Sequence, residues 1–516
     1  MKKESRTDNV IKNTKITILC HIVFLVCSFV CRTVFTKKLG AEYLGISGLF
    51  SNILTILSFA ELGLGSTLVY RLYKPFAEDD YNKINLYVKL YKKIYNVIII
   101  IILIVGLAII PFLKYLVEAP NVKESLILLY LLYLSQTVSS YLFVYKKTLL
   151  TANQKDYIVS IFNEVTNVLM NIIQCIILIF FKDFVLYLMI AIIFGIINNI
   201  ACSIYVDRKY HFLKNNVSGQ LSKDEINKLK KDTKGLMMTK VASTAFSGTD
   251  NIFISSYIGI KYVGILSNYT LILTTVNVLM NKIFSSITAS VGNLAVSDEN
   301  ANKTESVLFK MFFINTAMYS YICIGLALLI GEFVTMFWLN NDFYLSSIII
   351  ILTIFELYIR AIHYPLYTTR NAFGLFSQCR FIFVLSAILN IILDFILVKP
   401  LGIAGLIIAT IICRGITYVT DIYVIYKYGF KKSPQKYYYN LAKWLLFTII
   451  CYFITFIIFK YLKTINLLYF IFKVIIVTII YAMLFICVFY RSEEMKYYIN
   501  LVRNKIFKKN NKSNLQ

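Results

Sequence analysis

Charged residues are scarce in this chain of 516 residues, of which only 16% are Asp, Glu, Lys or Arg. A soluble domain has about a quarter of its residues charged, so this scarcity argues against a water-soluble protein. Proline is also rare, at six residues, and the 39 Phe and 39 Tyr exclude a disordered or collagen-like chain. With 58% hydrophobic residues, the composition predicts an all-α polytopic membrane protein.

Recognisable chemical motifs are also missing. The ten cysteines form no C-x-x-C pair, so neither a disulfide framework nor a zinc site is predicted. The chain contains no G-x-S-x-G, H-E-x-x-H or Walker A motif, and no D-x-D motif in an outside connection. We therefore expect no catalytic residues, no metal and no cofactor, and we do not expect an enzyme.

Long apolar runs divide the chain into membrane spans. A bilayer core about 30 Å thick requires about 20 apolar residues per helix. Windows of that size predict about 14 transmembrane helices. They lie at 16–36, 46–70, 94–117, 125–146, 157–181, 184–206, 236–258, 263–287, 311–331, 345–367, 376–398, 401–424, 441–462 and 467–489. No signal-peptide cleavage site follows the first run, so 16–35 is predicted to be a retained span.

The distribution of Lys and Arg predicts the orientation. If the N-terminus is cytoplasmic, 38 of the 53 basic residues lie on the inside and nine in outside connections. This bias predicts that both termini are cytoplasmic and that the number of spans is even. It also assigns the net charge of +26 to cytoplasmic loops rather than to nucleic-acid binding. The outside connections are too short for a catalytic domain.

An internal repeat predicts two related halves. Residues 39–46 read LGAEYLGI and residues 258–265 read IGIKYVGI, with four identities at a constant offset of 219. We expect a six-helix lobe with a cytoplasmic linker at 1–235, a second six-helix lobe at 236–426, and two further helices with a tail at 427–516. In the linker, Ser222 and Glu225 have the spacing of a capping box at the start of a surface helix.

Charges inside spans are the candidate functional groups, because each costs about 2.5–3.5 kcal/mol at mid-bilayer on insertion scales. We expect a water-filled cavity between the halves, lined by cations that bind an anionic substrate. The candidate binding residues are Arg32, Glu61, Asp250, Lys282, Arg360 and Arg414.

Structural roles are the alternative for several charged residues. Glu356 and Arg360 are spaced i,i+4 and are able to neutralise each other on one helix face. Lys282 lies near the cytoplasmic end of its span, where a lysine can snorkel. Glu164 and Asp421 lie near the inner face, which favours capping or surface pairing. His21 is expected to make an interfacial polar contact.

Several stretches together resemble bacterial polysaccharide repeat-unit (O-antigen or capsule) flippases. These belong to the multidrug/oligosaccharidyl-lipid/polysaccharide exporter superfamily. KKLGAEYLGISGLFSNILTILSFAELGLGS at 37–66 resembles the N-terminal signature, and NQKDY at 153–157 resembles the turn before the fifth span. TDNIFISSYIGIKYVGILSNY at 249–269 and the stretch 370–414 resemble the span 7–8 and span 11–12 regions. The resemblance covers roughly residues 10–430.

The resemblance implies a fold and a function. The fold would be two six-helix bundles in a V-shaped arrangement with two extra C-terminal helices. The substrate would be a polyprenyl-pyrophosphate-linked oligosaccharide, moved by alternating access from the inner to the outer leaflet of the bacterial cytoplasmic membrane. Implied partners are this lipid, the bilayer, H+ or Na+ as coupling ion, and the polysaccharide polymerase and chain-length machinery. The resemblance implies that cationic cavity residues engage the pyrophosphate, and the candidates for this role here are Arg32, Lys282, Arg360 and Arg414.

Two other functions remain open at this point. A cation-coupled multidrug exporter of the same superfamily would have a cavity dominated by acids, so the three span arginines favour the flippase. A membrane glycosyltransferase or polymerase would require a sizeable external loop with carboxylates, and the predicted outside connections contain none.

Overall fold

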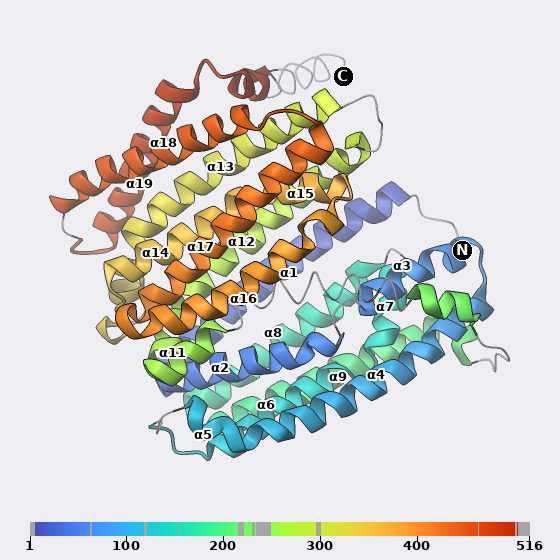
Figure 1. The fold of residues 1–516 in the computed structure, drawn as a ribbon. Coiled ribbons are helices and arrows are strands. Elements are labelled where there is room, and N and C mark those ends of the chain that lie inside the picture. The colour runs from blue at the N-terminus through green and yellow to red at the C-terminus, as the bar shows by residue number, and fades with distance from the viewer. Residues whose placement is uncertain are drawn as a thin grey trace, which may run out of the picture. The chain divides into compact units, whose positions relative to one another are not determined.

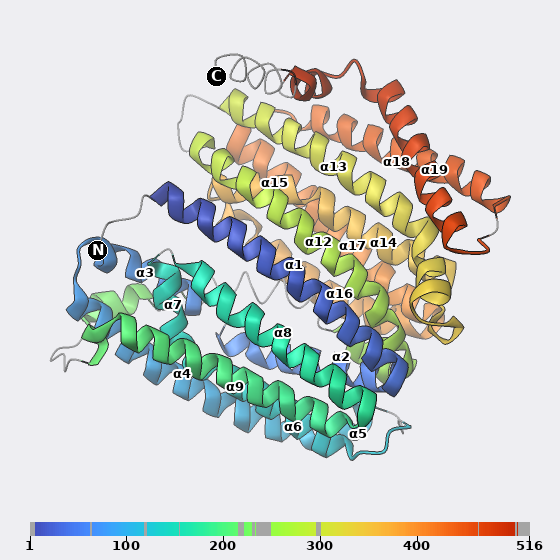
Figure 2. The ribbon, with the colours of Figure 1, turned by 180° about the vertical axis from the view of Figure 1, so that it is seen from behind.

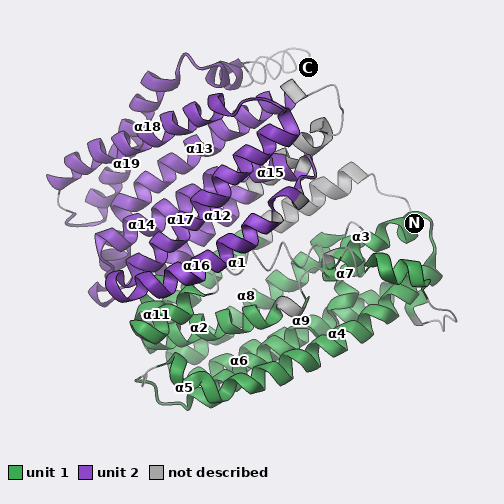
Figure 3. Cartoon of the chain, viewed as in Figure 1, with its two compact units in different colours: residues 1–267 green, residues 268–516 purple. Residues whose placement is uncertain are grey.

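The computed structural model describes residues 6–61, 64–117, 121–153, 155–214, 221–229, 249–295, 301–462 and 464–500, with Thr233 and Arg503. Every regular element in these ranges is helical, which confirms the all-α class (Figure 1). The chain divides into two compact units, Met1–Ser267 and Asn268–Gln516 (Figure 3). The predicted lobe boundary at 235/236 lies outside the described residues, so the three predicted domains remain a proposal.

Unit 1 contains the helices of the first half of the chain. They are α1 (Arg6–Leu39), α2 (Ala41–Leu57), α3 (Leu64–Ala77), α4 (Tyr81–Ile109), α5 (Leu113–Leu116), α6 (Leu126–Ser140), α7 (Val144–Ala152), α8 (Asp156–Phe180), α9 (Phe184–Lys209) and α11 (Asp250–Tyr257). The helix α8 packs between α1 and α9 (Figure 2). Its Leu169, Ile172 and Ile176 are exposed, whereas Asn171 and Gln174 are buried. Apolar side chains outside and polar ones inside are typical of a helix that faces lipid.

Unit 2 contains the remaining helices, and α12 begins just before it. They are α12 (Ile260–Ala295), α13 (Ala301–Glu332), α14 (Ser347–Ile362), α15 (Tyr364–Ala372), α16 (Phe376–Leu401), α17 (Ile403–Val424), α18 (Gln435–Lys460) and α19 (Leu467–Phe489). The two C-terminal helices pack on α13. Trp444 of α18 stacks on Phe489 of α19 at a centroid distance of 4.1 Å. Lys473 of α19 lies 2.7 Å from Glu332 of α13, an ion pair that anchors the added helices.

The described helices agree with a multi-pass membrane protein. Ten of them are long and apolar enough to cross a membrane, and the bent pair α6–α7 makes an eleventh. The predicted seventh span, 236–258, lies mostly outside the described residues. The predicted second span, 46–70, is interrupted, because α2 ends at Leu57 and a 3-10 turn at Ser58–Glu61 follows before α3. The count of 14 therefore stays a prediction.

The repeated turn has the same backbone design in both copies. Gly40 and Gly259 have φ angles of +91° and +126°, which favour glycine, and a helix begins directly after each. Within unit 1 the two copies also pack against each other. A Cβ on Gly45 would overlap the carbonyl oxygen of Ile260, and a Cβ on Gly264 would overlap that of Ala41. These two contacts correspond under the 219-residue offset, so the repeated glycines permit a reciprocal close approach.

The predicted capping box is confirmed. The backbone N–H of Glu225 donates to Ser222 Oγ at 3.2 Å, and the backbone N–H of Ser222 donates to Glu225 Oε2 at 3.1 Å. Residues 223–229 are helical. Lys83 Nζ lies 2.5 Å from Glu225 Oε1, and this hydrogen-bonded ammonium lowers the pKa of the Glu225 carboxyl. The linker helix is thereby attached to the start of α4.

Candidate functional site

Two arginines of unit 2 share one carboxylate. Glu356 Oε1 on α14 lies 2.5 Å from Nε of Arg414 on α17 and 3.7 Å from Nε of Arg360 on α14. The helices α14 and α17 pack together, which brings these distant positions into contact. We call Glu356, Arg360 and Arg414 the two-arginine cluster. It combines two positive charges with one negative charge, and its arginine side chains remain 32% and 21% exposed.

The two-arginine cluster contains the contact within one helix that the sequence offered as a structural alternative, and the predicted binding role of its arginines stays a prediction. The i,i+4 pair of Glu356 and Arg360 is present, as its spacing predicted. Arg414 joins the same carboxylate, so the structure brings two of the six candidate residues together. Sequence reasoning did not include Glu356 in the site, although the i,i+4 spacing was its signal. A carboxylate that orients two guanidinium groups, with an excess of positive charge, suits an anion such as a phosphate group.

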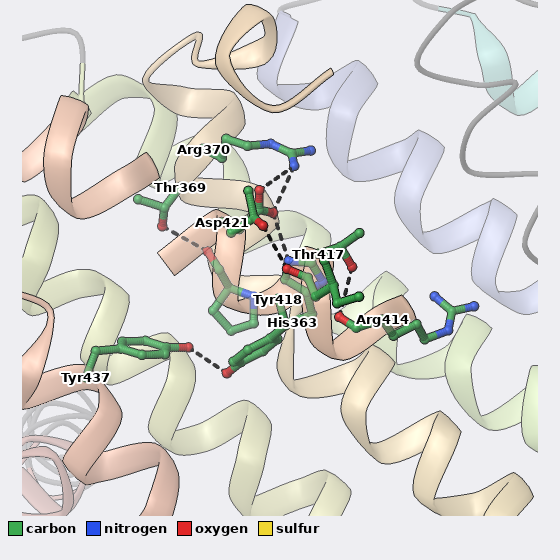
Figure 4. Close-up of polar contacts among 11 residues, drawn as sticks. His363, Thr369, Arg370, Arg414, Thr417, Tyr418, Asp421 and Tyr437 are labelled. Atoms are coloured by element: carbon green, nitrogen blue, oxygen red, sulfur yellow. Dashed lines mark hydrogen bonds and ion pairs between the residues drawn. The ribbon is translucent and has the colours of Figure 1, made fainter. Parts of the chain in front are cut away.

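A second ionic cluster lies nearby in the same unit, as Figure 4 shows. Arg370 Nη1 on α15 lies 2.7 and 2.8 Å from the two carboxylate oxygens of Asp421 on α17. His363 Nε2, between α14 and α15, lies 2.8 Å from Asp421 Oδ2. The Asp421 side chain is fully buried, so the predicted surface role is wrong. In Figure 4 the Arg414 side chain points away from this cluster, although Thr417 donates to its carbonyl oxygen.

Arg32 lies in unit 1, where it connects α1 to α12. Its Nη2 donates to Ser267 Oγ, and that hydroxyl donates to the Gly264 carbonyl at 2.7 Å. The 219-residue offset relates Arg32 to Asn251 and Ser267 to Gly48. A Cβ on Gly48 would lie 3.7 Å from Asn251 Nδ2, so the related residues also face each other. Arg32 therefore belongs to the reciprocal packing of the repeat, and its predicted cavity role stays a prediction.

Of the other three candidates, Glu61 and Asp250 belong to unit 1, and Lys282 belongs to unit 2. Glu61 ends the turn after α2, and its Oε1 accepts a hydrogen bond from Tyr95 on α4 at 3.0 Å. Asp250 is the first residue of α11 and is half-buried. Lys282 belongs to α12, and its side chain lies outside the described part of the structure. Within the described residues, no group of three His, Cys, Asp or Glu side chains is arranged to hold a metal ion.

Comparison with known proteins places the chain among glycan-related membrane proteins. A family model described as "Polysaccharide biosynthesis protein" matches residues 10–291, more than half of the chain. No curated protein sequence matches the chain.

Solved structures share the fold at low sequence identity. The lipid II flippase MurJ in an inward closed conformation has a TM-score of 0.64 and 16% identity, covering 94% of this chain and 99% of that chain. An inward-facing MATE multidrug resistance transporter of the MOP superfamily has a TM-score of 0.56 and 14% identity, covering 80% and 98%. The MATE transporter VcmN of Vibrio cholerae in its bent form has a TM-score of 0.52 and 14% identity, covering 81% and 98%. These likenesses confirm the expected exporter fold.

Proposed function

Because this chain belongs to the polysaccharide biosynthesis protein family, we propose that it is a flippase for polyprenyl-pyrophosphate-linked oligosaccharides in surface polysaccharide biosynthesis. It moves them from the inner to the outer leaflet of the bacterial cytoplasmic membrane by alternating access. The observation that carries the proposal is the two-arginine cluster in unit 2. Its excess positive charge inside membrane helices matches the negative charge of a pyrophosphate group.

The role of each residue follows from its contacts. Glu356 holds the two guanidinium groups near each other in the absence of substrate, which reduces the charge repulsion between them. An arriving pyrophosphate supplies more acceptor oxygens than one carboxylate and competes for the guanidinium donors. The two guanidinium groups are thus paired with an anion both before and after the substrate arrives, which lowers the cost of holding their charge in a low-dielectric interior.

A cation-coupled drug exporter is the second candidate, because MATE transporters share the fold. Such an exporter would bind cations, and two arginines on one carboxylate repel a cation. Enzymatic glycosyl transfer is not proposed, because the one carboxylate of the cluster is held by two guanidinium groups. In the proposed topology both termini are cytoplasmic, and the two six-helix lobes are 1–235 and 236–426. The proposed protein partners are the polysaccharide polymerase and the chain-length machinery. Reporter fusions to both termini test the orientation.

The two-arginine cluster provides the test of the function. We expect Arg414→Ala to reduce export of the glycan at least about tenfold, and Arg414→Lys to restore part of it, because lysine keeps the charge but not the fork. The measurement is the lipid-linked oligosaccharide on each leaflet of cells that lack the native protein and carry each variant. Arg208→Ala, at an exposed position of α9, is the matched control.

Clear outcomes separate the candidate functions. Trapping of lipid-linked oligosaccharide in the inner leaflet on deletion supports the flippase. Normal glycan export on deletion, with no second flippase present and with new drug sensitivity, would replace it with the drug exporter. Full activity of Arg414→Ala would show that the two-arginine cluster is only structural.

A further inference from the structure

A histidine and a glutamate meet between α1 and α8 in unit 1. His21 Nδ1 lies 3.1 Å from Glu164 Oε1, and the side chains are 17% and 16% exposed. Further along the same helices, Cys31 Sγ contacts Gln174 Oε1 at 4.0 Å. Both contacts join residues 143 apart in sequence, so α1 and α8 run in the same direction (Figure 2). We call the contact surface of these two helices, which contains both polar contacts, the α1–α8 seam.

Some polar atoms of this seam have no partner. Within the described structure, His21 Nε2 and Glu164 Oε2 are buried and make no hydrogen bond, and neither does Nδ2 of Asn171, a residue that is 7% exposed. Leaving buried polar atoms unpaired is unfavourable, so a stable packing role alone does not account for them. Histidine and carboxylate groups inside membrane helices are typical of proton pathways.

Among the described side chains, cations of the neighbouring helices contact groups other than Glu164. Of the described cations on the neighbouring helices, Lys146 lies 2.6 Å from Asp207, Lys147 contacts Asn163, and Arg32 binds Ser267. Other titratable groups along the seam are the thiols of Cys27, Cys31 and Cys175 and the phenol of Tyr187 on α9, which interacts with Cys31. The charge of Glu164 is therefore balanced by His21 when the imidazole is protonated.

We propose that the His21–Glu164 pair is a proton-binding site that takes up and releases one proton in each transport cycle. This inference rests on the proposed function and names its coupling ion. In the loaded state, the imidazolium Nδ1–H donates to the Glu164 carboxylate and the pair is neutral. On release, one proton passes to water, the imidazole becomes neutral, and one negative charge stays on Glu164.

The charge left on Glu164 links proton release to helix movement. An unbalanced carboxylate is strongly disfavoured in a closed, low-dielectric seam. Release therefore requires α1 and α8 to separate enough to admit water, and rebinding of the proton allows the seam to close. A sodium ion fits the site less well, because hard cations prefer several oxygen ligands and the pair offers one carboxylate and a nitrogen.

Proton binding can be measured directly because the chain has only three histidines, His21, His211 and His363. The full-length protein in lipid bilayers, labelled with 15N-histidine, is titrated by NMR, and His211→Gln and His363→Gln assign the signals. We expect Glu164→Gln to weaken proton binding at His21 at least about tenfold, because the stabilising carboxylate is lost. Glu164→Asp should retain most of the binding, and Glu124→Gln, on the Tyr43 hydroxyl, should leave it unchanged.

Each outcome decides between the site and an inert contact. An unchanged His21 titration in Glu164→Gln, with native His211 and His363 signals as evidence of folding, overturns the proposal. A second measurement follows a polyprenyl-pyrophosphate disaccharide in proteoliposomes, where a pH gradient should accelerate transport by the wild type but not by Glu164→Gln. Equal acceleration of both would overturn the coupling. The NMR titration requires no substrate, so failure of the flippase function would not change its result.

Discussion

Among the described residues, each compact unit has one contact between a histidine and a carboxylate, and the charges balance differently in the two contacts. In unit 2, Asp421 is fully buried and Arg370 binds both of its oxygens, so its charge is neutralised whether or not His363 is protonated. In unit 1, Glu164 has His21 as its ionic partner, so its charge depends on a proton. A permanent guanidinium makes the unit 2 contact structural. Without one, the unit 1 contact is suited to exchange a proton.

The largest expected effect comes from removing the carboxylate of unit 2. Asp421→Asn leaves the guanidinium of Arg370, 8% exposed, without its balancing charge. Breaking a buried ion pair in this way costs about 3–5 kcal/mol in the free energy of unfolding. The measurement is unfolding of the purified protein in mixed micelles.

His363→Gln is the matched control for this loss, because Arg370 still neutralises Asp421. We expect it to cost no more than about 1.5 kcal/mol, the value of one ordinary hydrogen bond. Equal losses in the two variants would contradict the assignment of Arg370 as the stabilising partner.

A permanent positive charge at His21 should make its contact with Glu164 behave like the Arg370–Asp421 ion pair of unit 2. His21→Arg keeps a cation beside Glu164 but is unable to release a proton at physiological pH. We expect this variant to fold and to lose the dependence of transport on pH between about pH 5 and pH 8, the range in which histidine titrates. Transport in proteoliposomes over that range is the measurement, and an unchanged pH profile would show that His21 is not the titrating group.

The smallest effect is expected for an ion pair that is exposed to water. The Lys83–Glu225 pair is 38% and 27% exposed, so Glu225→Gln should cost about 0–1 kcal/mol. The pKa of Glu225 is lowered, so its contribution is present above the ordinary carboxyl value of about 4.3 and is lost as pH falls through the lowered value. Unfolding of wild type and variant should therefore differ at neutral pH and converge in acid. A larger difference at low pH than at neutral pH would contradict this sign.

Local features of the molecule were predictable from the sequence. The apolar runs predicted helices, because a membrane-spanning backbone has to satisfy its hydrogen bonds internally. The internal repeat marked two segments that share a backbone design, and the Ser222–Glu225 spacing predicted a capping box. The Glu356–Arg360 contact was predictable for the same reason, since i,i+4 residues are neighbours on any helix.

The contacts between helices were not predictable in this way. Arg414 joins Glu356, Arg370 and His363 join Asp421, and His21 joins Glu164 only because particular helices pack at a particular register. The surface role predicted for Asp421 was wrong, because its depth in the membrane does not indicate which neighbouring helix covers it.

The sequence by itself therefore determined that this is an all-helical membrane protein with an internal repeat and charges retained inside its spans. The free-energy cost of a charge in lipid depends on that residue and its depth in the membrane, so it can be inferred from the sequence alone. The partner that neutralises each charge lies on another helix, and only the tertiary structure decided which charges are permanently balanced and which depend on a proton.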